Sequence, residues 1–120
     1  MAIFHLAHQS DWDAAQASGD YRISSRGLGL DQVGFIHAST AKQLSGVAEL
    51  FYRDDPEQLL VLVINEDALA QSGIEVEYEN GGDGEFFPHI YGPIMPGAVT
   101  RTIPAYFDSE GVFRLEEPLA

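Results

Sequence analysis

The sequence contains no cysteine and few positive charges, and these two absences exclude several classes of protein. Without cysteine there is no disulfide framework, no thiolate metal site and no cysteine nucleophile. Six Lys and Arg residues stand against nineteen Asp and Glu residues, so the formal net charge is −13. A chain with this charge repels phosphate backbones and anionic membrane surfaces, so we expect neither a nucleic acid nor a membrane as its partner.

Long hydrophobic runs are also missing. The longest apolar run, residues 59–64, has the length of a strand and falls far short of the roughly 18–20 residues that cross a bilayer. No basic segment precedes Asp11 and Asp13, which is unlike a secretory signal. The 120 residues, 45% of them hydrophobic, suffice for one globular domain over residues 1–120. We therefore expect a small, acidic, cytoplasmic protein of a single domain.

The order of the predicted elements favours an α+β fold. Hydrophobic periodicity predicts short strands over residues 3–6 and 33–38, each followed by a helix. Ser10 is expected to cap the first helix and Gly19 to end it, while Thr40 opens a capping box at the start of the second. The later predicted strands are 59–64, buried on both faces, 74–79, 98–105 and 112–114. Because helices come early and strands late, we expect a compact α+β domain with two main helices in its N-terminal half.

Three of the four histidines, His5, His37 and His89, lie in the middle of apolar segments that are predicted to be strands. A buried imidazole needs a partner for each ring nitrogen, or its burial costs free energy. One explanation is that each is a half-buried histidine satisfied by a backbone carbonyl. The other is that the strands are neighbours, so that the three imidazoles line a single cleft with Ser39 and Tyr91. Imidazole suits such a cleft because it donates, accepts and titrates near neutral pH.

A metal site has less support from the sequence. His5 and His8 are three residues apart on a predicted strand, so their side chains point to opposite faces. No predicted helix carries the His-x-x-x-His or Glu-x-x-His spacing of a metal site. We therefore expect no metal. The alternating glutamates within residues 74–79 fit a half-exposed strand with a solvated acidic face.

Two of the few cations, Arg22 and Arg26, lie within residues 21–29, a polar segment predicted to be a loop. Beside Ser24, Ser25 and backbone N–H groups, a guanidinium can hold a phosphate or a carboxylate. An ordinary surface loop with two solvated arginines explains the same residues equally well. Both interpretations stay open on the sequence alone.

The residues around the histidines resemble a small bacterial and plant family known as domain of unknown function 952. The resemblance depends mainly on Gly-Phe-Ile-His-Ala-Ser at residues 34–39 and Phe-Pro-His-Ile-Tyr-Gly-Pro at residues 87–93. It extends over residues 3–103 and includes Phe4, His5, Leu6, Trp12, Ala15, Gly19, Tyr21, Ser25, Gln43 and Val99.

That family in turn is similar to the ADP-ribosyltransferase fold, which implies split antiparallel sheets and NAD as a substrate. By this resemblance His5 contacts the nicotinamide ribose, and His37 with Ser39 packs against the nicotinamide. His89 takes the third catalytic position, where protein-modifying relatives carry a glutamate. The branch that acts on RNA 2′-phosphates is basic, so the charge of −13 argues against an RNA substrate.

The resemblance therefore implies an ADP-ribosyltransferase-like protein that binds NAD, another small nucleotide or a phosphorylated metabolite in a histidine-lined cleft. The alternative is a non-catalytic module of the same fold that binds a small ligand or a protein. The expected catalytic residues are His5, His37 and His89, and the expected ligand-binding residues are Ser39, Tyr91, Arg26 and Arg22.

Overall fold

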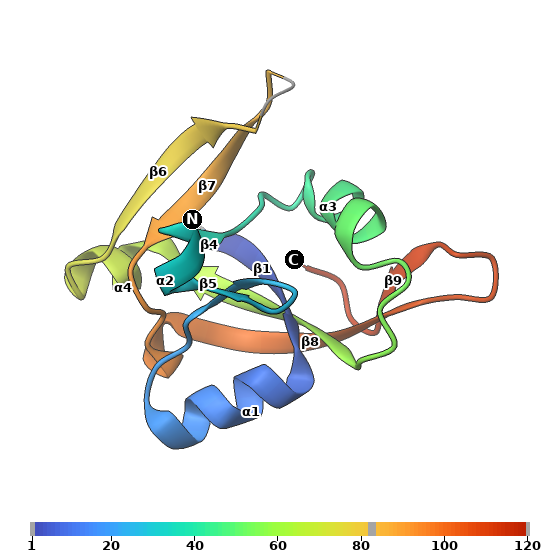
Figure 1. The fold of residues 1–120 in the computed structure, drawn as a ribbon, viewed down its shortest axis with the longest axis horizontal. Coiled ribbons are helices and arrows are strands. Elements are labelled where there is room, and N and C mark those ends of the chain that lie inside the picture. The colour runs from blue at the N-terminus through green and yellow to red at the C-terminus, as the bar shows by residue number, and fades with distance from the viewer. Residues whose placement is uncertain (1, 82–83, 120) are drawn as a thin grey trace.

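The structure is a computed structural model that describes residues 2–81 and 84–119 of the chain. Helices and strands alternate in the first half, and strands dominate the second (Figure 1), so the expected α+β class is confirmed. The strands are β1 (Ala2–His8), β2 (Ile23–Ser25), β3 (Leu28–Gly29), β4 (Ile36–His37), β5 (Leu59–Asn65), β6 (Glu75–Asn80), β7 (Phe86–Tyr91), β8 (Val99–Phe107) and β9 (Phe113–Leu115). The helices are α1 (Gln9–Ser18), α2 (Leu30–Val33), α3 (Leu44–Phe51), α4 (Glu66–Gln71) and the 3₁₀ turn η1 (Pro96–Ala98).

Two antiparallel sheets organise the fold. The larger has the strand order β1-β5-β8-β9, the smaller has the order β4-β7-β6, and β2 pairs with β3 in a separate hairpin. An isolated bridge between Phe4 of β1 and Ser39, two residues beyond β4, joins the larger sheet to the smaller one. In Figure 1 the β6–β7 hairpin projects from one end of the molecule and the β8–β9 hairpin from the other.

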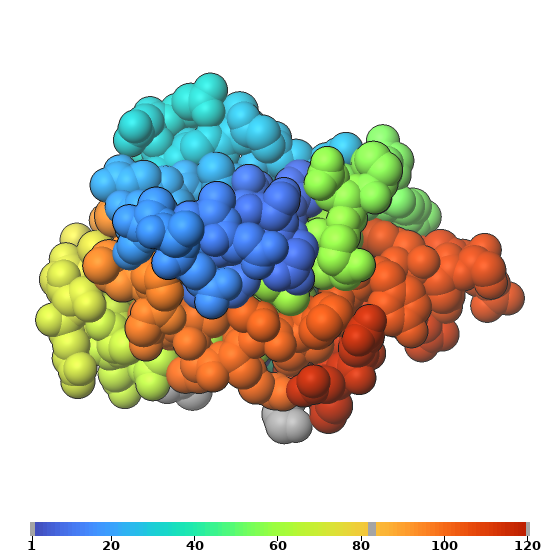
Figure 2. Space-filling view, turned by 90° about the horizontal axis from the view of Figure 1, so that it is seen from below, coloured from blue at the N-terminus to red at the C-terminus, as the bar shows by residue number. Residues whose placement is uncertain are grey.

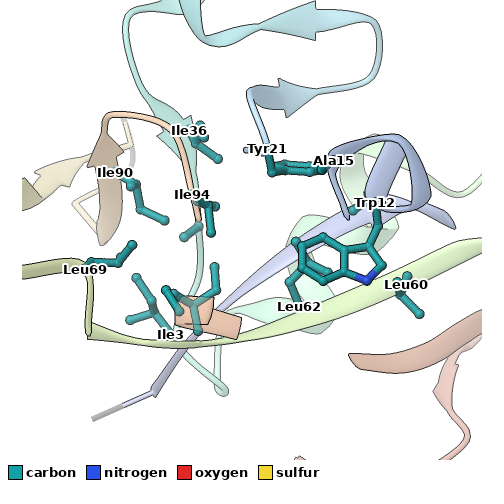
Figure 3. Packing of buried hydrophobic residues seen from close by; sticks show 14 residues of the cluster. Ile3, Trp12, Ala15, Tyr21, Ile36, Leu60, Leu62, Leu69, Ile90 and Ile94 are labelled. Carbon is teal, nitrogen blue, oxygen red and sulfur yellow. The ribbon is translucent and has the colours of Figure 1, made fainter. Parts of the chain in front are cut away.

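The main core lies between the larger sheet, the smaller sheet and α1. Every residue of β5 except the last is buried, which confirms the predicted central strand. Because side chains alternate along a strand, Leu60 and Leu62 face this core. Figure 3 shows Trp12 of α1 beside Leu60 and Leu62, whereas Ile36 of β4 and Ile90 of β7 gather at the other end of the cluster.

A second core covers the opposite face of the larger sheet. Val61 and Val63 of β5 pack there with Leu44 and Ala48 of α3 and with residues of β9. The apolar positions of α3 predict one buried stripe, but only Leu44, Val47 and Ala48 are buried, whereas Leu50 and Phe51 at its end are exposed. Burial of the first three fixes α3 against the sheet. The adjacent side chain of Val47 lies on the wall of the cleft described below.

Figure 2 shows the face of the molecule on which α1 lies, and Trp12 and Ala15 of this helix pack inward into the main core. The blue atoms of α1 lie across the middle of this face, and the orange atoms of η1 and β8 run beside them. Within residues 2–81 and 84–119, no helix has both the length and the apolar character needed to cross a membrane.

Two expectations about the first third of the chain are wrong. The predicted loop over residues 21–29 contains the β2–β3 hairpin, which turns at Arg26 and at Gly27 with φ +69°. Glycine adopts positive φ without strain, so Arg26-Gly27 is a turn signal. The polar composition of residues 21–29 suggests a loop instead and hides this signal. The predicted strand over residues 33–38 shrinks to Ile36–His37, because Val33 ends α2 and Gly34 adopts φ +98° as its C-cap.

The helix boundaries agree more closely with the sequence. Gly19 ends α1 with φ +101°, as expected, but α1 begins at Gln9, so the N-cap is His8 and not Ser10. Half of the expected capping box forms before α3: the N–H of Thr40 donates to Oε1 of Gln43 over 3.0 Å. The helix itself begins at Leu44 without a side-chain cap, a point that matters for the cavity beside it.

Candidate ligand-binding cleft

Two adjoining cavities form a cleft where α3 faces the β2–β3 hairpin and the smaller sheet. The smaller cavity has a volume of about 200 Å³ and the larger about 620 Å³. They share a wall made by Phe35, His37, Val47 and Phe51. His5 lines only the smaller cavity, and His89 lines only the larger one. His37 is thus the histidine that connects the two.

His37 presents the imidazole that is free to bind. Strand pairing sets it directly opposite His89, with ring centroids 5.6 Å apart, and Phe87 lies 5.4 Å away on the same strand as His89. Among the described residues, no group hydrogen-bonds either ring nitrogen of His37. Burial, and secondarily the nearby His89, lower the pKa of His37 to about 4. At neutral pH it therefore offers one donor and one acceptor to a ligand.

His89 is held by a carboxylate. Its Nδ1 lies 2.7 Å from Oε1 of Glu79 on the neighbouring strand β6, and its ring stacks on Phe35 at 3.9 Å between centroids. A carboxylate only accepts, so Nδ1 carries the proton and Nε2 is left for the cavity. The hydroxyl of Tyr91 donates to the same oxygen of Glu79. The hydrogen bonds from Tyr91 and His89 lower the pKa of Glu79, which keeps it an anion.

His5 has both nitrogens engaged. Its side chain is 2% exposed; Nδ1 donates to the backbone oxygen of His37 over 2.6 Å, and Nε2 accepts from the hydroxyl of Tyr21 over 2.8 Å. The carbonyl fixes this tautomer, because it can only accept. Burial lowers the pKa of His5 to about 4, so the ring is neutral. His5 thus positions the backbone of His37, and direct contact of His5 with a ligand stays a prediction that requires one of these bonds to open.

Ser39 lies between the two histidines of the smaller cavity. It is 2% exposed and lines that cavity with His5 and His37. Its backbone N–H donates to the oxygen of Phe4, which holds it beside β1. In the part of the chain that the structure describes, its hydroxyl has no hydrogen-bond partner. Because no buried side-chain polar atom of the described residues lacks a partner, this unpaired hydroxyl is open to the cavity, where it offers a donor and an acceptor to a ligand.

Comparison of the sequence with models of known families shows to which family the chain belongs. A family model described as "Protein of unknown function (DUF952)" matches residues 6–102. The chain belongs to this family. Both histidine motifs, at residues 34–39 and 87–93, fall inside the matched region, so the resemblance expected from them is confirmed at the level of the family.

Solved structures resemble this DUF952 chain over nearly its whole length. The crystal structure of protein CC0527 from Caulobacter crescentus has a TM-score of 0.80 and 28% sequence identity, covering 95% of this chain and 94% of that chain. The solution NMR structure of the same protein has a TM-score of 0.73 and 29% identity, covering 92% and 90% of the two chains. No protein with a curated description matches the sequence.

The two arginines expected to hold an anion lie outside both cavities of this DUF952 protein. Arg22 pairs with Asp20 over 2.9 Å. Arg26 pairs with Asp54 over 2.7 Å and with Asp55 over 2.9 Å, on the segment that follows α3. Neither arginine belongs to the lining of either cavity. Their binding to a ligand stays a prediction, and the geometry shows them in ion pairs instead.

The sequence argument missed Glu79 and Lys42. Glu79 belongs to the alternating glutamates that predict a solvated strand, and only the pairing of β6 with β7 reveals that it meets His89. Tyr91, expected to touch the ligand, supports Glu79 from outside both cavities. Lys42 lines the larger cavity. Its signal in the sequence is that it is the single lysine of the chain, two residues before α3.

The described residues contain no group of three or more His, Asp or Glu side chains placed to hold a metal ion. Among its lining residues the cleft offers a ligand imidazoles, hydroxyls and aromatic faces, together with the ammonium of Lys42 and the carboxylate of Glu85.

Proposed function

We propose that this DUF952 protein binds a small nucleotide in the cleft and uses NAD as the substrate of an ADP-ribosyl transfer. The observation that carries the proposal is the placement of His37. Its unbonded imidazole belongs to the wall that the two cavities share, together with Phe35, and its ring lies 5.4 Å from the ring of Phe87. A planar heterocycle such as nicotinamide gains both stacking on these rings and hydrogen bonds to the imidazole.

The arrangement of the sheets supports the same proposal. An ADP-ribosyltransferase-like fold has split antiparallel sheets, and here two antiparallel sheets meet at the bridge between Phe4 and Ser39. The motif histidines lie at that junction, because His5 belongs to β1, whereas His37 and His89 pair across β4 and β7. The cavities, of about 200 and 620 Å³, give a nicotinamide and the ribose phosphate beyond it separate places.

In the transfer step, the bond between C1′ of the ribose and the nicotinamide nitrogen breaks, and its electron pair leaves with neutral nicotinamide. A hydroxyl of the acceptor forms the new bond to C1′. Nε2 of His89 takes the proton that this hydroxyl gives up, and Glu79 stabilises the resulting imidazolium through Nδ1. The hydroxyl of Ser39 and the imidazole of His37 hold the nicotinamide ribose in place.

Nicotinamide release tests the proposal. Purified protein is incubated with NAD and candidate acceptors, and nicotinamide formation is followed together with a mass gain on the acceptor. We expect release by the wild type and its loss in His37→Ala. The matched control is His8→Ala, which removes a histidine that is paired with Asp55 outside both cavities. Equal release by the wild type and His37→Ala would refute the transfer reaction.

A second candidate function, a non-catalytic binding module, is favoured by one observation. Both nitrogens of His5 are bonded within the protein, so one of the three expected catalytic imidazoles is occupied. Thermal unfolding against NAD, ADP-ribose and nicotinamide distinguishes the two functions. A ligand that raises the unfolding temperature by mass action and is recovered unchanged supports the binding module.

A further inference from the structure

The six cations of this acidic chain are not equivalent. Each of the five arginines has an acidic side chain within ion-pair distance: Arg22 with Asp20, Arg26 with Asp54 and Asp55, Arg53 with Glu49, Arg101 with Glu117 and Arg114 with Asp108. Lys42, the sixth cation, has no such partner within residues 2–81 and 84–119. With nineteen acidic residues in the chain, a lysine without one is conspicuous.

The surroundings of Lys42 provide further donors. It lines the larger cavity together with His37, His89 and Gly46. Gly46 lies in the first turn of α3, which has no side-chain cap, and no described group accepts a hydrogen bond from its N–H. The space where a Cβ of Gly46 would stand is open. Residues with an ammonium, an imidazole N–H and a free backbone N–H, namely Lys42, His37 and Gly46, thus line one cavity of about 620 Å³.

One group of the cavity has the opposite charge. Glu85 also lines it, and its carboxylate accepts a hydrogen bond from Nε2 of Gln43 over 2.9 Å. An anion in the cavity would be attracted by Lys42 and repelled by Glu85. The two residues therefore reveal the sign of a ligand's charge. If the ligand is an anion, neutralising Lys42 should weaken its binding, whereas neutralising Glu85 should strengthen it.

We propose that the larger cavity is a phosphate subsite, in which Lys42 pairs with the phosphate or diphosphate of a nucleotide. The inference deepens the proposed function and relies on it for the nucleotide, but the pairing with an anion can be tested alone. Phosphate oxygens are strong acceptors, and a charge-assisted hydrogen bond from an ammonium is about twice as strong as a neutral one. The imidazole N–H of His37 and the backbone N–H of Gly46 can satisfy further phosphate oxygens, whereas Nε2 of His89 is an acceptor and stays available as the base.

Titration calorimetry at low salt with inorganic pyrophosphate, ADP-ribose and adenosine tests the subsite. We expect Lys42→Gln to weaken pyrophosphate and ADP-ribose about tenfold, the equivalent of one charge-assisted hydrogen bond. Lys42→Arg should bind as the wild type does, and Glu85→Gln should bind more tightly. The matched control is Arg114→Gln, which removes the same charge outside both cavities and should change affinity less than twofold. The affinity for adenosine, which has no phosphate, should be the same in the wild type and in Lys42→Gln.

The outcomes separate this subsite from the NAD proposal. Binding of pyrophosphate that depends on Lys42, with no binding of ADP-ribose or NAD, would support the subsite and count against NAD. ADP-ribose that binds equally to the wild type and Lys42→Gln would overturn the subsite and leave the nucleotide proposal standing. Absence of binding by both anions would overturn both proposals.

Discussion

Lowering the pH from about 7.5 to about 4.5 should protonate His5 in the unfolded chain and leave it mostly neutral in the folded protein. The imidazole is buried, and both of its nitrogens are already committed, to the carbonyl of His37 and the hydroxyl of Tyr21. Protonation of Nε2 would turn an acceptor into a donor facing a hydroxyl, without water to solvate the charge. Mild acid therefore favours unfolding through this residue.

The size of the effect follows from the pKa of His5, which burial lowers from 6.5 to about 4. This difference corresponds to about 3–4 kcal/mol, at about 1.4 kcal/mol for each pKa unit. Because the folded pKa is the lower one, the unfolded state binds more protons between these values. The contribution is complete above pH 6.5 and is lost as the pH falls toward 4. At about pH 4.5 the loss reaches about 2–3 kcal/mol, a large part of the stability of a typical domain.

Urea unfolding across this pH range measures the loss. The pKa of His37 is also lowered to about 4, so the wild type should lose more than His5 alone accounts for. The variant His37→Ala keeps His5 and should still lose about 2–3 kcal/mol between about pH 7.5 and 4.5. Carboxylates whose pKa is lowered in the folded protein, such as Glu79, also stabilise it. Their contribution is lost only below about pH 4.5. A ring NMR signal of His5 that titrates near 6.5, or a flat stability over this range, would refute the reasoning.

Three other predictions concern the core, a turn and the Glu79 pair. Leu62→Ala should lower the free energy of unfolding in urea by about 2–5 kcal/mol, because Leu62 is fully buried in the core. The control Leu50→Ala, at a side chain that is 75% exposed, should change it by less than about 0.5 kcal/mol. Equal losses in the two variants would contradict this packing. Gly34→Ala should destabilise the protein by about 1 kcal/mol or more in thermal unfolding, because φ is +98° there, and an unchanged midpoint would contradict this backbone conformation. Glu79 raises the pKa of Tyr91 to about 12, so Glu79→Gln should lower it toward 10 in a tyrosinate absorbance titration; an unchanged pKa would remove Glu79 as the cause.

The parts of the fold that the sequence predicts are those set by local pattern. Six successive apolar residues predict β5 as a buried centre, and Gly19 at positive φ marks the end of α1. Asn65 is of a residue type that favours the N-cap, and its side chain accepts a hydrogen bond from the N–H of Ala68 at the start of α4. The β2–β3 hairpin escapes the same reasoning, because its strands are two and three residues long and carry no period that composition can show.

The site is predicted only in part, because its geometry depends on strand pairing. The motifs single out His37 and His89, which do lie opposite each other. They give no sign that His5 uses both nitrogens within the protein, since its partner Tyr21 lies sixteen residues away. Glu79 reaches His89 through a diagonal contact between neighbouring strands. Lys42 differs from the arginines because it has no ion-pair partner among the described residues. Such relations exist only once the chain is folded.

The two-residue strand β4 depends on groups from distant parts of the chain. The N–H of His37 donates to Oγ of Ser24, thirteen residues earlier, and its carbonyl accepts from His5, thirty-two residues earlier. The cleft therefore depends on the whole domain and has no local scaffold of its own. A chain shortened by its first strand would keep the sequence of both histidine motifs. It would still lose the hydrogen bond from His5 to the carbonyl of His37. Preservation of the motifs in a fragment or a diverged copy is thus no guarantee that the cleft exists there.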